Sequence, residues 1–208
     1  MSNYCSTIDV NYLSQIAFQQ LGMATQSELN NWLAGTLIPI AQVFVNKYCN
    51  HNFGSNTGTI ICDGNGKESL HIPPSCLLNG APAELLPLPL ISVSQVSIDG
   101  TVGTITDFKI YKTFLAYECG IFCDGRQNVE IVAVYGYNVV PEDIKYVTAQ
   151  LCANALTEMV RKRMLPDLIT PILEGGGDVG ILFRSPKVLT ENEKAILWQY
   201  IFHHIEVA

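Results

Sequence analysis

Residues 129–156 have the sequence VEIVAVYGYNVVPEDIKYVTAQLCANAL, and the spacing of the apolar residues changes within this stretch. Residues 129–135 have the pattern of a short β-strand, and a helical stripe follows at Ile144, Val147, Leu151 and Ala155. The tripeptide Pro141-Glu142-Asp143 stands between them. Proline suits a first helical turn because its missing N–H has no partner there, and acidic side chains favour the positive end of the helix dipole. The stretch therefore predicts a β region followed by a helix.

Residues 1–53 also predict helices. Apolar residues keep helical spacing from Leu29 to Tyr48, and Thr25-Gln26-Ser27-Glu28 matches a capping box at the start of that helix. Pro39 lacks the N–H of a helix interior and predicts a kink or a restart near Thr36. Residues 9–21 predict a shorter helix before the capping box.

Residues 57–137 predict short β-strands separated by glycine, aspartate and proline. Residues 57–62 and 68–72 flank the turn sequence Asp63-Gly64-Asn65-Gly66, which predicts a β-hairpin. Several further strands of this kind are typical of a small antiparallel sheet or sandwich.

The C-terminal region combines a glycine-rich segment with a last helix. Gly175, Gly176 and Gly177 predict a hinge within residues 173–186, because glycine accepts backbone angles that other residues avoid. Thr190-Glu191-Asn192-Glu193 is a second capping box and predicts the start of the last helix.

The expected fold class is α+β: a helical bundle of two long helices and a C-terminal helix, with an inserted small antiparallel β-sheet or sandwich. The expected domains are a helical body formed by residues 1–55 and 138–170, an inserted β domain at 56–137, and a glycine-hinged C-terminal arm and helix at 171–208.

The composition limits the classes of function. Of the 208 residues, 48% are hydrophobic and only 15% are charged, which allows a large core or an apolar surface kept for partners. A net charge of −7 argues against a protein that grips nucleic acid, although it suits a pore through which DNA slides. The apolar runs are far shorter than the roughly 18 residues of a membrane helix, so a soluble protein without membrane contact is expected.

Motifs that resemble chemical sites do not have the context that such sites need. Gly175, Gly177 and Gly180 fit GxGxxG, but no βαβ unit surrounds them. Asp63 and Asn65 begin like an EF-hand loop, but the residues that follow do not fit and a turn is expected. Seven irregularly spaced cysteines predict reduced thiols, and Cys62, Cys119 and Cys123 lack zinc-site spacing.

Charged and titratable groups near the C-terminus also have ordinary explanations. Arg161-Lys162-Arg163 suits the negative end of a helix dipole, with contact to an acidic partner as the alternative. His203 and His204 have no matching nucleophile elsewhere in the sequence. We therefore expect no catalytic residue, no metal site and no cofactor, and the chain is predicted not to be an enzyme.

The last part of the chain is the predicted surface for a neighbouring subunit or another partner. Aromatic side chains are enriched at the energetic centres of interfaces, and a mobile arm can become ordered on a neighbour. The alternative is that Trp198 and its neighbours complete the chain's own core. The predicted interface residues are Ile181, Leu182, Phe183, Leu197, Trp198, Tyr200, Ile201 and Phe202.

Residues 26–205 resemble the Gp6-like head-tail connector family of tailed bacteriophages. The order and spacing of several segments carry the resemblance: Ile40 to Cys49 followed by Asn52-Phe53, Asp63-Gly64-Asn65-Gly66 with Leu70-His71-Ile72-Pro73, Leu88 to Val93 leading to Asp99-Gly100, Val134-Tyr135-Gly136-Tyr137, Val140-Pro141-Glu142-Asp143-Ile144, Gly177-Asp178-Val179-Gly180 and Leu189-Thr190. The chain departs from the simplest members in its longer N-terminal extension and proline-rich loop. Its last helix also carries aromatic and histidine residues where charged residues are common.

The resemblance implies a virion structural protein without catalytic residues, assembled in the host cytoplasm and located in the neck. Proteins of this family form dodecameric rings that bind the portal protein above and a stopper or tail-completion protein below, and double-stranded DNA passes through the ring. The alternatives are another neck component, such as a stopper or tail terminator, or a small cytosolic metal-binding protein or enzyme.

Overall fold

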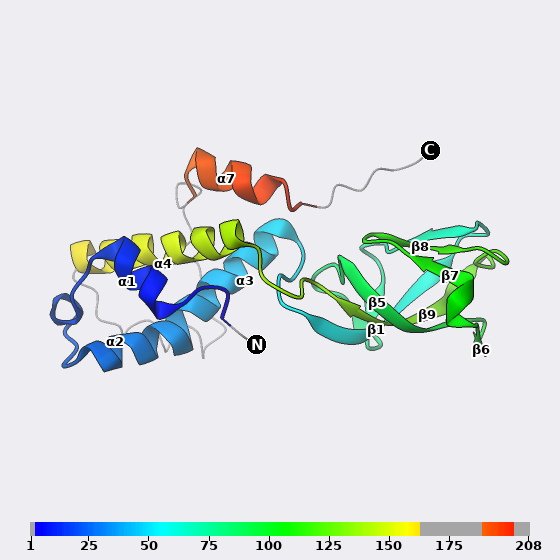
Figure 1. Ribbon diagram of the computed structural model, residues 1–208, viewed down its shortest axis with the longest axis horizontal. Helices are drawn as coiled ribbons and strands as arrows, with labels where there is room; N and C mark the ends of the chain where they lie inside the picture. Colours follow the sequence, from blue (N-terminus) through cyan, green and yellow to red (C-terminus); the bar gives the residue numbers. More distant parts are fainter. Residues whose placement is uncertain (1–2, 163–188, 202–208) are drawn as a thin grey trace. The chain divides into compact units, whose positions relative to one another are not determined.

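A computed structural model describes residues 3–162 and 189–201 of the chain. The chain forms two compact units, a helical unit (Met1–Cys49 and Val140–Ala208) and a β unit (Asn50–Val139). The colours in Figure 1 follow the chain from one unit into the other and back. The described helices of the helical unit are α1 (Thr7–Ser14), a 3-10 turn (Phe18–Leu21), α2 (Gln26–Trp32), a π-helical turn (Leu33–Leu37), α3 (Ile38–Cys49), α4 (Glu142–Lys162) and α7 (Glu191–Trp198).

The predicted irregularity near Thr36 is confirmed as the π-helical turn between α2 and α3. Pro39 has no N–H to donate, and its ring would collide with the carbonyl four residues earlier in a regular helix. The turn instead lets the Ile38 N–H donate to the Leu33 carbonyl, five residues back. The side chain of Asn3 donates to the Ala34 carbonyl at 3.1 Å and so satisfies an acceptor within this turn.

Both sequences predicted to form capping boxes stand at helix starts, but the reciprocal pair of bonds is complete only at Thr190 and Glu193. The Glu28 N–H donates to Thr25 Oγ1 at 3.1 Å at the start of α2, where the Glu28 carboxylate accepts from the Ala24 N–H at 2.8 Å. On α4, the apolar stripe predicted from the sequence is buried and contributes to the core of the helical unit. None of the described helices has the length and apolar character needed to cross a bilayer.

The β unit contains two antiparallel sheets. The six-stranded sheet has the order β4-β3-β1-β9-β5-β6, and the three-stranded sheet has the order β2-β8-β7. The first is built from β1 (Asn56–Gly64), β3 (Leu77–Leu78), β4 (Ala81–Pro82), β5 (Leu90–Ile98), β6 (Thr101–Val102) and β9 (Gly125–Tyr135), and the second from β2 (Ser69–His71), β7 (Phe108–Ile110) and β8 (Phe114–Tyr117). A short 3-10 turn (Ile105–Asp107) precedes β7. Side chains from both sheets are fully buried, among them Ile60, Val96, Ile131 and Leu115.

The expected fold class, a helical bundle with a small inserted sheet, was wrong. The structure is mixed α and β, with a large six-stranded antiparallel sheet and a second three-stranded sheet, and a helix-bundle core is not present among the described residues. The strands were identified individually, but their pairing into one large sheet depends on contacts between residues far apart in sequence, such as Ile60 opposite Ile131.

The predicted β-hairpin at residues 57–72 was also wrong. Strand β1 pairs with β3 and β9, whereas β2 pairs with β8 and places Leu70 opposite Leu115. After Gly64 the chain does not fold back on β1, because the Gly66 N–H donates to the Phe122 carbonyl at 2.7 Å and the Phe122 N–H donates to the Lys67 carbonyl at 2.8 Å. The turn residues were recognised correctly, but the strands on either side of them belong to different sheets.

Candidate functional site

Helix α7 packs against α3 and α4, and its best-buried apolar side chain is Leu197. The predicted capping box is confirmed at its start, where the Glu193 N–H donates to Thr190 Oγ1 at 3.3 Å and the Thr190 N–H donates to Glu193 Oε2 at 2.6 Å. Near its end, the Cys49 thiol of α3 donates to the Leu197 carbonyl at 3.7 Å. Figure 1 shows α7, in orange, lying beside α4. The C-terminal helix is therefore anchored in the core of its own unit.

A carboxylate at the start of α4 holds the end of α7. The Tyr200 hydroxyl donates to Asp143 and lies 2.7 and 2.8 Å from the two carboxylate oxygens. The Gln199 side chain donates to the same carboxylate at 3.0 Å, and the Ile144 N–H donates to it at 3.0 Å from within the first turn of α4. Hydrogen bonds to an ionised acceptor are stronger than neutral ones, so Asp143 ties two elements together that are 57 residues apart.

Replacing Asp143 with alanine should destabilise the helical unit by about 1–2 kcal/mol, since it removes the hydrogen bonds that the Tyr200 hydroxyl and the Gln199 amide donate to this carboxylate. Tyr200→Phe removes the same contact from the other side. In a double-mutant cycle measured by chemical denaturation, the two substitutions should be strongly non-additive. Strictly additive losses would contradict the contact.

Several helices leave large apolar side chains in solvent. Ile8 and Tyr12 on α1 are 75% and 78% exposed, and they lie four residues apart on one side of that helix. Tyr146 on α4 is 51% exposed and Trp198 on α7 is 60% exposed. We refer to Ile8, Tyr12, Tyr146 and Trp198 as the exposed apolar set. Exposed aromatic and aliphatic groups of this size are candidate contacts with another protein surface.

The predicted interface residues divide between core, surface and undescribed positions. Leu197 is buried in its own chain, Trp198 is exposed, and Tyr200 and Ile201 are half-buried. The other predicted positions lie outside the described residues: Ile181, Leu182, Phe183, Phe202 and the predicted hinge Gly175, Gly176 and Gly177.

Sequence reasoning missed Ile8, Tyr12 and Tyr146. A signal exists for Tyr12 and Tyr146, because both are large apolar residues on predicted helices but lie off the apolar stripe of those helices. Ile8 precedes the helix predicted over residues 9–21, so the sequence contains no such signal for it. The basic cluster at the end of α4 has a local explanation in its described part, where Arg161 pairs with Glu158 at 2.6 Å. His203, His204 and the side chains of Lys162 and Arg163 lie outside the described part.

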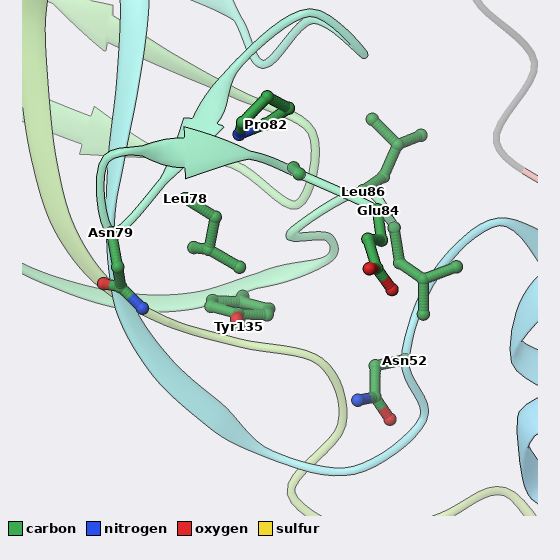
Figure 2. A pocket seen from close by; sticks show the side chains of 9 residues that line it. Asn52, Leu78, Asn79, Pro82, Glu84, Leu86 and Tyr135 are labelled. Carbon is green, nitrogen blue, oxygen red and sulfur yellow. The ribbon is translucent and has the colours of Figure 1, made fainter. Parts of the chain in front are cut away.

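The β unit contains a cavity of about 290 Å³ beside the β3–β4 hairpin. Leu78, Pro82 and Leu86 supply apolar walls, and Glu84, Asn52 and Tyr135 supply polar atoms (Figure 2). Burial raises the pKa of Tyr135 above its ordinary value. This lining is suited to holding an apolar group with one or two hydrogen bonds.

The motifs that resembled metal sites have other structural roles. Asp63 accepts the Gln127 N–H at 2.6 Å and so links β1 to β9, and Asn65 Oδ1 accepts the Lys67 N–H at 3.1 Å within the turn. Cys119 and Cys123 are exposed, while Cys62 is buried on β1. Within residues 3–162 and 189–201, no group of three or more His, Cys, Asp or Glu side chains is arranged to bind a metal ion.

A scan of protein-family models and a search of curated proteins both found no match for this chain.

Proposed function

We propose that this chain is a structural subunit of a phage virion, a head-to-tail connector that assembles into a ring beneath the portal and joins the DNA-filled head to the neck and tail. The proposal combines the resemblance described above with one observation that carries it. The helical unit places Ile8, Tyr12, Tyr146 and Trp198 on its surface, on three different helices.

The exposed apolar set favours a contact with other copies of the chain. Hydrophobic burial drives most protein association, and buried aromatic anchors dominate the energy of interfaces. When two different surfaces of one subunit bind each other, a rotation that closes produces a ring. The number of subunits, twelve, is implied by the resemblance alone.

The charge distribution supports passage of DNA through such a ring. The net charge is −7, and four basic side chains already have carboxylate partners. These are Lys145, Arg161 and Lys194, each paired with a glutamate three residues away, and Lys109, paired with Glu118. Strong DNA binding requires basic groups that neutralise phosphates. A wall with this composition would allow DNA to slide without adhering.

The C-terminal part of the chain would present Trp198 to the portal or to a neighbouring subunit. Leu197 anchors α7 from one side, and the adjacent Trp198 faces solvent. A helix held in its own core presents an aromatic group at a defined position, which lowers the entropic cost of binding. The role of residues 171–188 as an arm remains a prediction from the sequence.

The test is to mix the purified full-length protein with the cognate portal protein and to image the product by electron microscopy. The expected result is an added ring on the portal. Mass photometry of the complex then measures the mass that the ring adds. Portal is included because many connectors of this kind are monomers until the portal templates their ring. A protein that stays monomeric and adds no density to the portal would overturn the proposal.

The double variant Ile8→Ser/Tyr12→Ser should reduce ring formation at least tenfold. It removes exposed apolar area and leaves the core unchanged, so its thermal midpoint should stay within a few degrees of wild type. Asn192→Ser, an exposed polar change on α7, is the matched control and should assemble normally. Normal assembly of the double variant would exclude this face of α1 from the interface.

A further inference from the structure

Two buried cysteines of the β unit are in contact, Cys62 on β1 and Cys76, the residue that precedes β3. Strand β1 pairs with β3 so that Ile60 is opposite Leu78 and Ile61 is opposite Leu77. Continuing this antiparallel register by one residue places Cys76 opposite Cys62. The pairing of β3 with β4 also reaches Cys76, because the N–H of Ala83, the residue after β4, donates to the Cys76 carbonyl at 3.2 Å.

The hydrogen-bond pattern shows which kind of pair the cysteines form. The Asn79 N–H donates to the Thr59 carbonyl at 2.8 Å and the Thr59 N–H donates to the Asn79 side chain at 2.9 Å, so residues 59 and 79 stand at a hydrogen-bonded position of the ladder. Pairs alternate along an antiparallel ladder, which makes Cys62 and Cys76 a non-hydrogen-bonded pair with a Cα separation of about 4.5 Å. Disulfides span Cα separations of about 4.4–6.8 Å. The backbone therefore needs little movement for a bond between the two sulfur atoms.

The two thiols are in contact and line the same cavity. The Cys62 thiol is hydrogen-bonded to Cys76, an interaction that lowers the pKa of Cys76 and raises the pKa of Cys62. Both residues line a cavity of about 140 Å³, together with Asp63, Ser75, Arg126 and Gln127. The hydrogen bond from Cys62 lowers the pKa of Cys76 and so favours its thiolate, and Cys62 lies in contact with it.

We propose that Cys62 and Cys76 are a redox site that forms a reversible intramolecular disulfide when the protein meets hydrogen peroxide. The Cys76 thiolate attacks one peroxide oxygen, the O–O bond breaks, and the departing hydroxide takes up a proton to become water. The Cys62 sulfur then attacks the resulting sulfenic acid of Cys76. An S–S bond forms, the S–O bond breaks, and the second oxygen leaves as water with the Cys62 proton. The two thiols supply the two electrons that reduce the peroxide.

The disulfide would attach the β3–β4 edge of the six-stranded sheet to β1. Edge strands with few partners open most readily, and β3 and β4 have only two residues each. A disulfide between Cys62 and Cys76 closes the loop that joins them and so restricts the unfolded chain. Oxidation should therefore raise the thermal midpoint of the β unit by about 10 °C.

The experiment uses the full-length protein with Cys119→Ser and Cys123→Ser, because these two exposed thiols would themselves react with peroxide and obscure the reaction of Cys62 and Cys76. The protein is treated with hydrogen peroxide under native conditions, remaining thiols are alkylated, and peptides are mapped by mass spectrometry. The expected result is a peptide that links Cys62 to Cys76, a loss of two hydrogen atoms from the intact mass, a higher thermal midpoint, and reversal by dithiothreitol.

The Cys62→Ser variant should form no link, and a sulfenic-acid probe such as dimedone should then label Cys76. Recovery of both cysteines as separately alkylated or over-oxidised residues in the parent protein would overturn the proposal. The parent result stands by itself if Cys62→Ser does not fold.

Discussion

Replacing Gly136 with alanine is expected to destabilise the β unit by roughly 4 kcal/mol or more, which is enough to unfold many small domains. A Cβ atom built at Gly136 lies 2.1 Å from the Gly54 carbonyl oxygen and 3.3 Å from the Asn52 carbonyl oxygen. The backbone φ of Gly136 is +96°, a conformation that alanine rarely adopts. The Gly136 N–H donates to the Pro89 carbonyl at 2.8 Å, so a shift that relieves the collision would break this bond.

Chemical denaturation measures this effect, and Gly100→Ala is the matched control. Gly100 also has a positive φ, +75°, but nothing lies within 4 Å of its added Cβ. The free energy of unfolding of Gly100→Ala should therefore fall by only about 1 kcal/mol, the cost of placing alanine at a positive φ. Equal losses in the two variants would mean that the close approach to Gly54 contributes nothing.

Replacing Leu197 with alanine is expected to destabilise the helical unit by about 2–5 kcal/mol, the range for a fully buried leucine. Leu197 is 0% exposed, so the substitution removes contacts with the core and leaves a cavity. The position of Trp198 depends on this anchor, so the variant should also bind the portal more weakly than wild type. Thermal unfolding and hydrogen exchange of residues 189–201 provide the measurements.

The neighbouring Ile196→Ala is the control, because Ile196 is half-buried on the same helix. It should cost less than half as much as Leu197→Ala. If Leu197→Ala unfolds like wild type, α7 does not pack on α3 and α4 in solution. The proposed presentation of Trp198 by its own unit would then lose its basis.

Sequence by itself determined where several helices begin and which residues cover their buried faces. Thr25, Thr190 and Pro141 mark helix starts through bonds or geometry within one turn, and such short-range effects can be read from neighbouring residues. The irregularity near Thr36 was predicted for the same reason, since Pro39 acts on the carbonyl four residues before it. The form of that irregularity, a π-helical turn, was not predicted.

Only the tertiary structure decided how the strands pair and which apolar side chains remain outside. The turn at Asp63 to Gly66 has the same local chemistry whether or not its flanking strands bond to each other, so it could not reveal that β2 pairs with β8. The fold class failed at this point, because a six-stranded sheet depends on partners far apart in sequence. The same holds for Cys62 beside Cys76 and for the exposure of Tyr12, since register and burial are properties of the packed chain.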